Sequence, residues 1–384
     1  MKILHLYSDW KWTGPAEVVI QMCQSLEDLG HEVIFACRAT PQRHKNQEET
    51  IEIKAAEYGI NFTTQFALNR YLGFRDTVHD IFALPKFIKK EKIDVVHTHL
   101  SHDHGLGVYL AKIISERKTI FVKSIHKRKV LKDKFWNKVL LKETKKKQGI
   151  LLFSETFKKQ YIKNFSIPPQ TIGICPMPLD LTKFNLNITY TNQREKFNIP
   201  EFAPLIGIVA RYQKYRRMDV FINAARKVVD EIPETKFIII GRSGQMNDTV
   251  IKPMKEMGLE KNFILPGYLI DNYVDTLATL DIFTLMMPGF DGTARALREA
   301  MALGVPCVAS DVGMLPDIVQ HEKTGLLFPL DDSNELAECW IRLIKDKEEL
   351  KKMGQTAAKY AEDNFRINEV GLTLAKFYEG LFKE

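Results

Sequence analysis

The chain has 384 residues, of which 45% are hydrophobic and 27% charged, so it is long enough for two globular domains. It contains no run of 18 apolar residues, and we therefore expect no membrane-spanning helix. The opening MKILHLYSDW is typical of a first strand and not of a signal peptide. Five scattered cysteines without a CxxC pair predict reduced, buried thiols in a cytoplasmic protein.

The net charge of +7 is distributed unevenly along the chain. Residues 1–180 contain 29 Lys and Arg against 19 Asp and Glu, whereas the remainder contains 26 against 29. Most of the excess lies in residues 123–147, KSIHKRKVLKDKFWNKVLLKETKKK, where apolar residues are interspersed. Such a segment either contacts an anionic membrane at its inner face or forms a solvated basic helix on its own domain. No recognition motif accompanies the charge, so we expect no nucleic-acid partner.

The first part of the chain alternates short, β-branched apolar runs with amphipathic stretches. Apolar residues at helical spacing predict helices over residues 15–30 and 104–118. The apolar runs predict five strands, at residues 1–8, 32–38, 93–100, 119–126 and 149–155. Alternation of strand and helix is typical of a parallel sheet that is covered by helices on both faces.

The alternation stops at residues 181–200, which are polar and without a clear period and predict a linker. It resumes with five further apolar runs, at residues 204–212, 235–243, 261–268, 280–289 and 304–311. We therefore expect an α/β protein of two tandem Rossmann-like domains, residues 1–183 and 201–365, joined by a linker over 184–200. Such sheets bind ligands at the C-terminal ends of their strands, so two domains facing each other form a cleft.

The stretch DGTARALREAMALG, residues 291–304, carries acidic residues on a helix that otherwise looks like core. Asp291 and Gly292 follow a predicted strand and start the helix, where exposed amides favour an anion and glycine permits close approach. Glu299 lies about 12 Å further along the helix axis, where a carboxylate could hold a ribose. Two structural alternatives remain open: Asp291 caps the helix, and Glu299 pairs with Arg295.

Residues 291–332 closely resemble the retaining glycosyltransferases of family four, which have the GT-B fold. The family pattern is a Glu, seven residues, a second Glu and, later, a Pro–acid pair. Here Glu299 matches the second Glu, Pro316–Asp317 the later pair, and Asp291 replaces the first Glu. The resemblance implies that Glu299 binds the ribose of the donor and that Asp291 contacts its sugar. The amides that would hold the sugar and the diphosphate belong to Gly292, Thr293, Ala294 and Arg295.

A second match to this family lies in GIVARYQKYRRMDVFINAARKV, residues 207–228. The family has an Arg after a strand and then a Lys, usually followed by Gly, both directed at the donor diphosphate. Arg211 takes the first position, Arg216 the second, and Arg217 stands where the Gly is usual. Two cations there would stabilise the negative charge that grows on the leaving diphosphate. The alternative is that these arginines are solvated loop residues. The expected donor site also includes Gly241 and Tyr268, at the ends of the next two predicted strands.

The resemblance covers most of the chain, densely over residues 205–330 and sparsely before residue 100. In the first domain it implies that Gly14 meets the sugar phosphate and that His126 lies at the bottom of the cleft near the reacting sugar. Two departures from the family stand out: Pro15 replaces a second glycine, and PMPLD, residues 176–180, replaces the usual PNGVD. The usual architecture further implies that residues 366–384 form a helix that crosses back to the first domain.

Four histidines at short spacing in HTHLSHDH, residues 97–104, raise the possibility of a zinc site. Alternation along a strand sends neighbouring side chains to opposite faces, so cleft-lining or ordinary histidines are the favoured interpretation. No Asp-x-Asp lies in a suitable loop. We therefore expect neither a metal nor another cofactor, with cations and amides binding the diphosphate.

The resemblance implies a retaining glycosyltransferase that moves a sugar from a UDP- or GDP-linked donor to a glycan or lipid-linked acceptor, as in envelope polysaccharide or glycoconjugate synthesis. The family's favoured mechanism is front-face attack, in which the leaving phosphate accepts the acceptor's proton. Two alternatives remain: a sugar-nucleotide epimerase of the same fold, and a catalytically silent protein that binds nucleotide sugars. A hydride-transfer enzyme is disfavoured because no GxGxxG follows the first strand.

Overall fold

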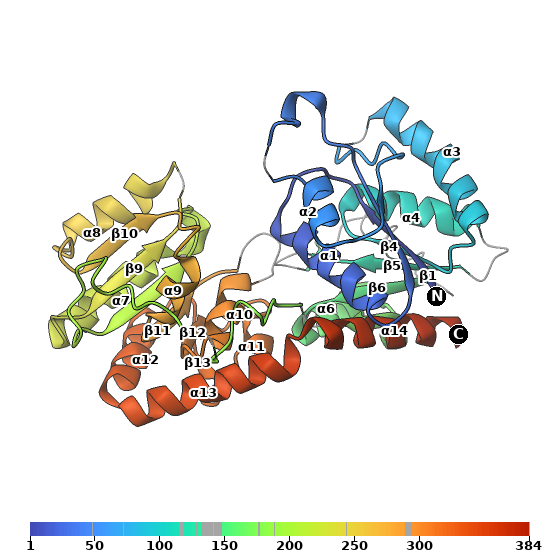
Figure 1. Cartoon of the computed structure of the whole chain (residues 1–384). Helices are drawn as coiled ribbons and strands as arrows, with labels where there is room; N and C mark the ends of the chain where they lie inside the picture. The colour runs from blue at the N-terminus through green and yellow to red at the C-terminus, as the bar shows by residue number, and fades with distance from the viewer. Residues whose placement is uncertain are drawn as a thin grey trace. The chain divides into compact units, whose positions relative to one another are not determined.

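The computed structural model describes residues 1–47, 49–71, 73–114, 119–126, 130–131, 141, 148–175, 177–187, 189–242, 244–288 and 294–383. The chain divides into two compact units, and each contains one sheet (Figure 1). The first unit comprises Met1–Pro178 and Ile367–Glu384, and the second comprises Leu179–Arg366.

The first unit contains a seven-stranded parallel sheet with the order β3-β2-β1-β4-β5-β6-β7. The order reverses between β1 and β4, which is the switch point where open α/β sheets bind ligands. All five strands predicted in this part of the chain are present, together with the short β3 and β7. The bounds are β1 (Lys2–Tyr7), β2 (Glu32–Cys37), β3 (Phe62–Thr63), β4 (Val95–Thr98), β5 (Ile120–Ser124), β6 (Gln148–Leu152) and β7 (Ile172–Ile174).

Helices cover the sheet of the first unit, so β4, β5 and β6 are buried at every position. The first unit also contains two short 3₁₀ segments, Gln42–His44 and Pro169–Thr171. The helices are α1 (Gly14–Glu27), α2 (Ile51–Glu57), α3 (Phe74–Glu91), α4 (Ser101–Ile113), α6 (Glu155–Phe165) and α14 (Ile367–Lys383).

The C-terminal helix α14 is an integral part of the first unit, where it lies beside α1 (Figure 1). A Cβ on Gly371 would lie 2.5 Å from the carbonyl oxygen of Ser25, so only glycine permits this approach of α14 to α1. The hydroxyl of Tyr378 is hydrogen-bonded to His97 Nδ1 at 2.7 Å. The last helix of the chain therefore contacts both α1 and the central strand β4.

The second unit contains a six-stranded parallel sheet with the order β10-β9-β8-β11-β12-β13. Its switch point lies between β8 and β11. All five strands predicted here are present, and β13 is added. The bounds are β8 (Leu205–Val209), β9 (Lys236–Ile240), β10 (Phe263–Gly267), β11 (Ile282–Leu285), β12 (Cys307–Ser310) and β13 (Gly325–Phe328).

Aromatic residues form the centre of the core between this sheet and its helices. Trp340 packs against Phe221 and Phe237 with ring centroids 5.0 and 5.7 Å apart, and its indole nitrogen donates to Thr284 Oγ1 at 2.9 Å. The helical segments are 3₁₀ Lys214–Arg216, α7 (Met218–Glu231), π-helical Asn247–Ile251, α8 (Lys252–Glu256), α9 (Tyr273–Ala278), α10 (Arg295–Ala302), α11 (Leu315–Ile318), α12 (Ser333–Lys345) and α13 (Lys347–Asn364).

The described part of the predicted linker, residues 184–187 and 189–200, belongs to the second unit. The buried guanidinium of Arg194 donates to the carbonyl oxygens of Pro200 and Ala203 at 3.1 and 2.7 Å and to Asp281 at 2.7 Å. A buried guanidinium must form hydrogen bonds with surrounding acceptors. The bonds of Arg194 to Pro200, Ala203 and Asp281 therefore hold this polar segment in a defined position.

The basic segment 123–147 lies mostly outside the described residues. Its described start, Lys123–Ser124, belongs to β5 and is buried. Both interpretations of its charge therefore stay open. In the described part of the chain, no helix is both long and apolar enough to cross a membrane.

Candidate functional site

The two sequence motifs of the second unit meet at the switch point of its sheet. β8 and β11 are adjacent, with Ile206 opposite Ile282 and Gly207 opposite Phe283. Because both strands are parallel, the segments that follow them leave from the same edge. The side chain of Arg216, after β8, donates from Nη1 to the backbone oxygen of Met287, after β11. This contact joins two motifs that lie 71 residues apart in the chain.

The three arginines after β8 have different environments. Arg211 is exposed at the strand end, and Arg216 is half-buried. Arg217 has φ 57° and ψ 45°, a left-handed conformation that favours glycine and explains why glycine is usual at this position. Its guanidinium is paired with Asp219, at 2.9 Å from Nη2 to Oδ2, and with Asp331. Arg217 therefore directs its charge toward two carboxylates of its own unit.

Glu299 is the most deeply buried of those predicted donor-site side chains that the structure describes, at 1% exposure. Its Oε1 accepts from Arg295 Nε and its Oε2 accepts from the hydroxyl of Tyr273, both at 2.6 Å. Burial and, secondly, the Glu299 carboxylate raise the pKa of Tyr273 well above its usual value, so its hydroxyl stays a donor. The Arg295–Glu299 pair that the sequence offered as a structural alternative is thus present. No motif in the sequence predicted the role of Tyr273.

The helix start that was expected to hold the diphosphate is described only in part. Ala294 is buried and has φ 44° and ψ 38°, and α10 begins at the next residue, Arg295. The predicted ligands Asp291, Gly292 and Thr293 lie outside the described residues. Their assignment to the sugar and the diphosphate remains a prediction.

Gly241 and Tyr268 lie at the carboxyl ends of β9 and β10. A Cβ on Gly241 would lie 2.0 Å from the carbonyl oxygen of Ala210, so the close approach of two strand ends requires glycine there. Tyr268 is 60% exposed, and the guanidinium carbon of Arg242 lies 4.7 Å from its ring centroid. Backbone packing alone accounts for Gly241, whereas the exposed ring of Tyr268 is available to a ligand.

At the switch point of the first unit, four buried histidines form a continuous cluster. His5 lies in β1, His97 in β4, His99 directly after β4 and His126 after β5. His5 Nδ1 lies 2.9 Å from His99 Nε2, and His99 Nδ1 lies 3.4 Å from His126 Nε2. The loop after β1 leads from this cluster to Gly14, the first residue of α1. The structure thus brings two predicted residues of the first domain to one edge of its sheet.

Burial makes these imidazoles neutral. It lowers the pKa of His5 to about 3 and that of His126 to about 4, and it holds the pKa of His97 and His99 well below the usual range. His126 is therefore a weak base at neutral pH. Its Nδ1 is buried and has no hydrogen-bond partner among the described residues.

Three of these histidines, His5, His97 and His99, place ring nitrogens within 4.8 Å of one another, a separation that a metal ion could span. The chemistry of the donor set is suitable for zinc, but both nitrogens of His97 are engaged, with Tyr378 and with Ser124 Oγ, each at 2.7 Å. A metal would have to displace one of these bonds. The cluster is better described as a buried polar core, in which His5 Nε2 and His126 Nδ1 have no hydrogen-bond partner among the described residues.

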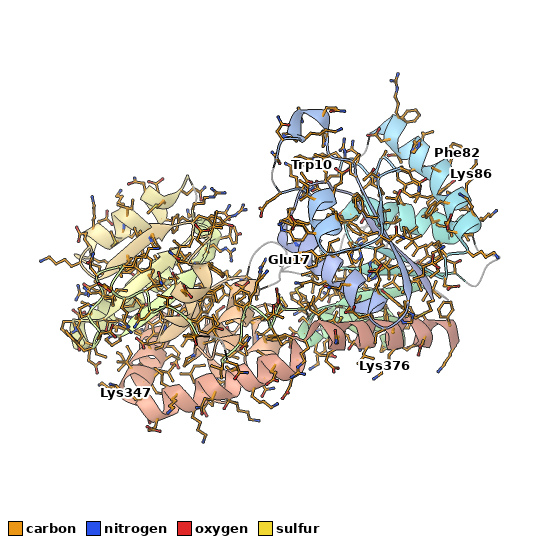
Figure 2. All side chains as sticks on the ribbon, viewed as in Figure 1. Trp10, Glu17, Phe82, Lys86, Lys347 and Lys376 are labelled. Carbon is orange, nitrogen blue, oxygen red and sulfur yellow. The ribbon has the colours of Figure 1, made fainter. Side chains whose placement is uncertain are left out.

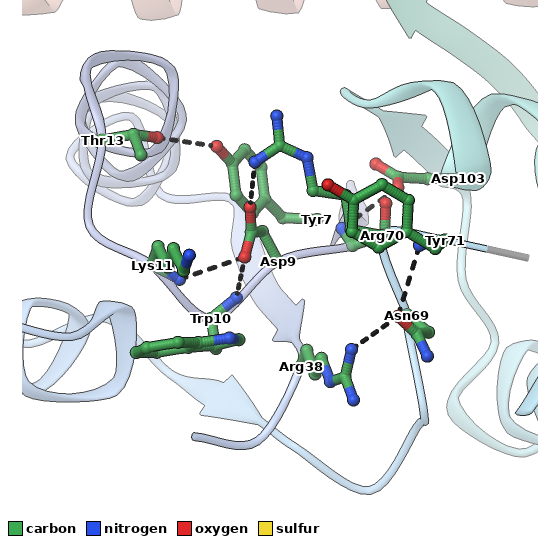
Figure 3. A network of polar contacts seen from close by, with 11 residues as sticks. Tyr7, Asp9, Trp10, Lys11, Thr13, Arg38, Asn69, Arg70, Tyr71 and Asp103 are labelled. Carbon is green, nitrogen blue, oxygen red and sulfur yellow. Dashed lines mark hydrogen bonds and ion pairs between the residues drawn. The ribbon is translucent and has the colours of Figure 1, made fainter. Parts of the chain in front are cut away.

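A pocket that the sequence did not predict lies elsewhere on this sheet edge. It is lined by cationic side chains, which include Lys11, Arg38 and Arg70, and by Trp10. Arg38 is the last residue of a predicted strand, residues 32–38, and directly follows the observed β2. Figure 3 shows the polar contacts around it.

Two family profiles together match almost the whole chain. Residues 12–183 match the profile of "Glycosyltransferase Family 4", and residues 189–360 match that of "Glycosyl transferases group 1". The chain belongs to the group 1 glycosyltransferases. It is therefore an enzyme of the glycosyl-transferring class, as the resemblance implied.

Named relatives of this glycosyltransferase support the same class. N-acetyl-alpha-D-glucosaminyl L-malate synthase of Bacillus anthracis is 23% identical over 363 residues, which cover 93% of this chain and 91% of the relative. UDP-Gal:alpha-D-GlcNAc-diphosphoundecaprenol alpha-1,3-galactosyltransferase of Escherichia coli is 28% identical over 291 residues, which cover 73% of this chain and 74% of the relative.

Solved structures confirm the predicted GT-B fold. A glycosyltransferase from Rickettsia africae superposes with a TM-score of 0.80 at 16% identity, covering 100% of this chain and 99% of the other. Anabaena HepE in complex with UDP superposes with a TM-score of 0.78 at 16% identity, covering 98% and 99%. At these identities the similarity concerns the fold.

Proposed function

We propose that this glycosyltransferase transfers a sugar from a UDP-linked donor to a glycan or lipid-linked acceptor, with retention of the anomeric configuration. The contact between Arg216 and the backbone oxygen of Met287 carries the proposal. It fixes a guanidinium at the switch point, beside the segment that leads into α10. A galactosyltransferase named for a UDP donor and a HepE structure with UDP support the choice of nucleotide.

In the proposed mechanism, Arg211 and Arg216 stabilise the diphosphate as it leaves. The bond from the anomeric carbon to the phosphate oxygen breaks, and the acceptor oxygen bonds to the same face of that carbon. The acceptor's proton passes to the departing phosphate oxygen. Guanidinium groups form charge-assisted, often bidentate hydrogen bonds with phosphate, and such bonds strengthen as the negative charge develops. Because these groups supply the positive charge, the proposed step uses neither a metal nor another cofactor.

Glu299 is proposed to bind the hydroxyls of the ribose. A carboxylate offers about four lone-pair sites, and the bonds from Arg295 and Tyr273 occupy one on each oxygen. The remaining sites can accept ribose hydroxyls while both present bonds persist. Burial at 1% exposure holds the carboxylate in one rotamer and prepares it for this role.

Asp291 and His126 are each proposed to contact the donor sugar. The amides of residues 292–295 would hold its phosphates, and Gly14 would permit the sugar phosphate to approach the loop after β1. The remaining donor contacts are proposed for Arg217, Gly241 and Tyr268. A neutral His126 suits hydrogen bonding to the sugar or to the departing oxygen better than proton abstraction, because its pKa is about 4.

The acceptor and the location are proposed from the relatives and from the sequence. The Escherichia coli relative is named for an acceptor linked to diphosphoundecaprenol, which supports a lipid-linked substrate. All five cysteines are free and buried, which agrees with a reducing, cytoplasmic compartment. Residues 123–147 would then contact anionic lipid at the inner face of the membrane. Flotation with anionic liposomes at low salt tests this contact, and a protein that stays unbound there contradicts it.

Ligand-dependent melting and slow donor hydrolysis test the donor site. We expect UDP to raise the melting temperature of the wild-type enzyme, because a ligand of the native state stabilises it. Arg211→Ala and Arg216→Ala should each lose most of this shift and at least tenfold in donor hydrolysis. Lys255→Ala, at an exposed position on α8, is the matched control. Equal shifts and rates in all four proteins would contradict the proposed site, and an inverted product in the anomeric NMR signals would contradict retention.

A further inference from the structure

A cationic pocket lies at the carboxyl edge of the sheet of the first unit, where β1, β2 and β3 end. Its lining comes from the segments that follow these three neighbouring strands. Trp10 and Lys11 follow β1, Arg38 and Arg43 follow β2, and Arg70 follows β3. The pocket has a volume of about 220 Å³. Whole small-molecule sites are typically about 300–1,000 Å³, so this volume suits one chemical group of a larger ligand.

The pocket has a large excess of positive charge. Lys11, Arg38, Arg43 and Arg70 line it together with a single acid, Asp9. Asp9 Oδ2 pairs with Arg70 at 2.9 Å, and Oδ1 accepts from the backbone amides of Trp10 and Lys11 at 2.8 and 3.3 Å (Figure 3). Asp9 therefore balances the charge of Arg70. The charges of Lys11, Arg38 and Arg43 are not balanced by any other acid that lines the pocket.

In the part of the chain that the structure describes, the remaining cations have no acidic partner. Arg38 Nη1 donates to the neutral side-chain oxygen of Asn69 at 2.5 Å, as Figure 3 shows. Among the described residues, no carboxylate lies within 4.0 Å of the charged nitrogens of Lys11, Arg38 or Arg43. Three neighbouring cations repel one another, and an anion in the pocket would relieve this repulsion.

Backbone hydrogen bonds and a ring contact hold the segment Asp9–Trp10 in the pocket. The carbonyl oxygen of Asp9 accepts from the amide of Arg38 at 3.3 Å, and that of Trp10 accepts from the amide of Ile51 at 3.0 Å. The indole of Trp10 stacks on His44 with centroids 4.6 Å apart. These contacts hold the backbone at Asp9 and Trp10, which reduces the entropy that this segment would lose on binding.

We propose that this pocket binds a phosphoryl group, a phosphate or diphosphate, that is carried by the acceptor. The inference rests on the proposed function and deepens it by naming the acceptor's chemical class. Three cations match a dianion or trianion better than a single carboxylate, and arginine forms bidentate hydrogen bonds with phosphate oxygens. The donor's own diphosphate is assigned to the second unit, where Arg211 and Arg216 lie.

Direct binding tests the proposal independently of the donor site. Inorganic pyrophosphate is titrated into the full-length Arg211→Ala/Arg216→Ala protein, and the fluorescence of Trp10 is followed, with Trp10→Phe as the signal blank. The second unit's two arginines then cannot contribute, and the result does not depend on whether UDP binds. We expect saturable binding at low salt that weakens about tenfold to a hundredfold when Arg38→Gln/Arg43→Gln is added.

The matched control is Lys86→Gln/Lys163→Gln, which removes two charges from exposed positions on α3 and α6 (Figure 2 labels Lys86). It should bind pyrophosphate as the parent does. Arg43→Gln alone is a milder change at an exposed residue and should give a smaller loss in the same direction. Melting curves verify that each variant folds. Absent binding in the parent, or equal affinity in the Arg38/Arg43 variant and the control, would overturn the proposal.

Matched ligands then identify the carrier of the phosphate. N-acetylglucosamine 1-phosphate should compete with pyrophosphate, and N-acetylglucosamine should not. Vesicles of phosphatidylglycerol without a soluble phosphate ligand should not compete, and competition by vesicles alone would overturn the assignment to an acceptor. With an active acceptor, Arg38→Gln/Arg43→Gln should raise the acceptor KM at least tenfold and leave donor hydrolysis unchanged. An equal fall in both activities would indicate a structural role and contradict the inference.

Discussion

The four buried histidines should make the stability of the first unit fall as the pH is lowered. Burial lowers the pKa of His5 to about 3 and that of His126 to about 4, from the usual 6.5. At about pH 5 the folded protein keeps both rings neutral, whereas the unfolded chain binds a proton on each. At about 1.36 kcal/mol per pH unit, each ring then removes about 2 kcal/mol of stability. The two together remove about 4 kcal/mol, out of the roughly 5–15 kcal/mol that stabilises a typical domain.

The direction follows from the lowered pKa values. The contribution is fully present above the unfolded pKa of about 6.5 and is lost progressively below it. His97 and His99, whose pKa values lie well below the usual range, act in the same direction. The second unit contains one of the ten histidines, the exposed His321, so its stability should change much less.

Hydrogen exchange at about pH 7.5 and pH 5, corrected for the intrinsic exchange rates, measures both units in one sample. The opening free energy of β1 and β4 should fall by several kcal/mol, and that of β8 and β11 should serve as the internal reference. His5→Asn removes one titrating ring and should reduce the pH-dependent loss by about 2 kcal/mol, whatever its effect on absolute stability. Equal changes in both units would refute the conclusion that the cluster is neutral and buried.

Two substitutions in the second unit follow from its contacts. Gly241→Ala places a Cβ 2.0 Å from the carbonyl oxygen of Ala210 and should lower the free energy of unfolding in denaturant by roughly 2–4 kcal/mol. In Gly244→Ala, the control, the added Cβ meets open space and should lower this free energy by less than about 0.5 kcal/mol. Tyr273→Phe removes the 2.6 Å bond to Glu299 and should weaken UDP binding by calorimetry about tenfold. Unchanged UDP affinity would contradict the proposal that Glu299 binds the ribose.

The sheet architecture could be predicted because a parallel sheet covered on both faces produces continuous apolar runs. Ten strands were found in this way. β3 and β7, of two and three residues, were missed because they are too short to show a pattern. Strand β13 was missed as well, although its sequence, GLLF, is apolar.

The candidate donor site could be predicted only where its residues are neighbours in the chain. Arg211, Arg216 and Glu299 lie in two local motifs, and the strand order supports their convergence at the switch point. Tyr273 was missed because its bond to Glu299 spans 26 residues and depends on how α9 packs. A single tyrosine in a loop-rich segment gives no periodic signal of such a contact.

The cationic pocket was missed for a topological reason. Its arginines and lysine follow three different strands, and only the order β3-β2-β1 brings those strand ends together. The charge pattern along the chain instead indicates residues 123–147, where many cations lie close together in the sequence. A charge excess in sequence shows where cations are frequent, whereas a binding site depends on which cations converge.

In both units, arginines follow parallel strands. The groups that accept their hydrogen bonds differ, and the acceptor indicates whether an arginine stabilises its own unit or is oriented toward a ligand. Arg70 and Arg217 are paired with carboxylates, so their charges are balanced within their own units. Arg38 instead donates to the neutral amide oxygen of Asn69, which orients its guanidinium without cancelling its charge. Arg216 donates to the backbone oxygen of Met287, and this contact likewise orients its guanidinium. A site for an anionic ligand requires such oriented cations, because a fully paired arginine would have to release its carboxylate first. Replacement of Arg38 should therefore affect ligand binding more than folding.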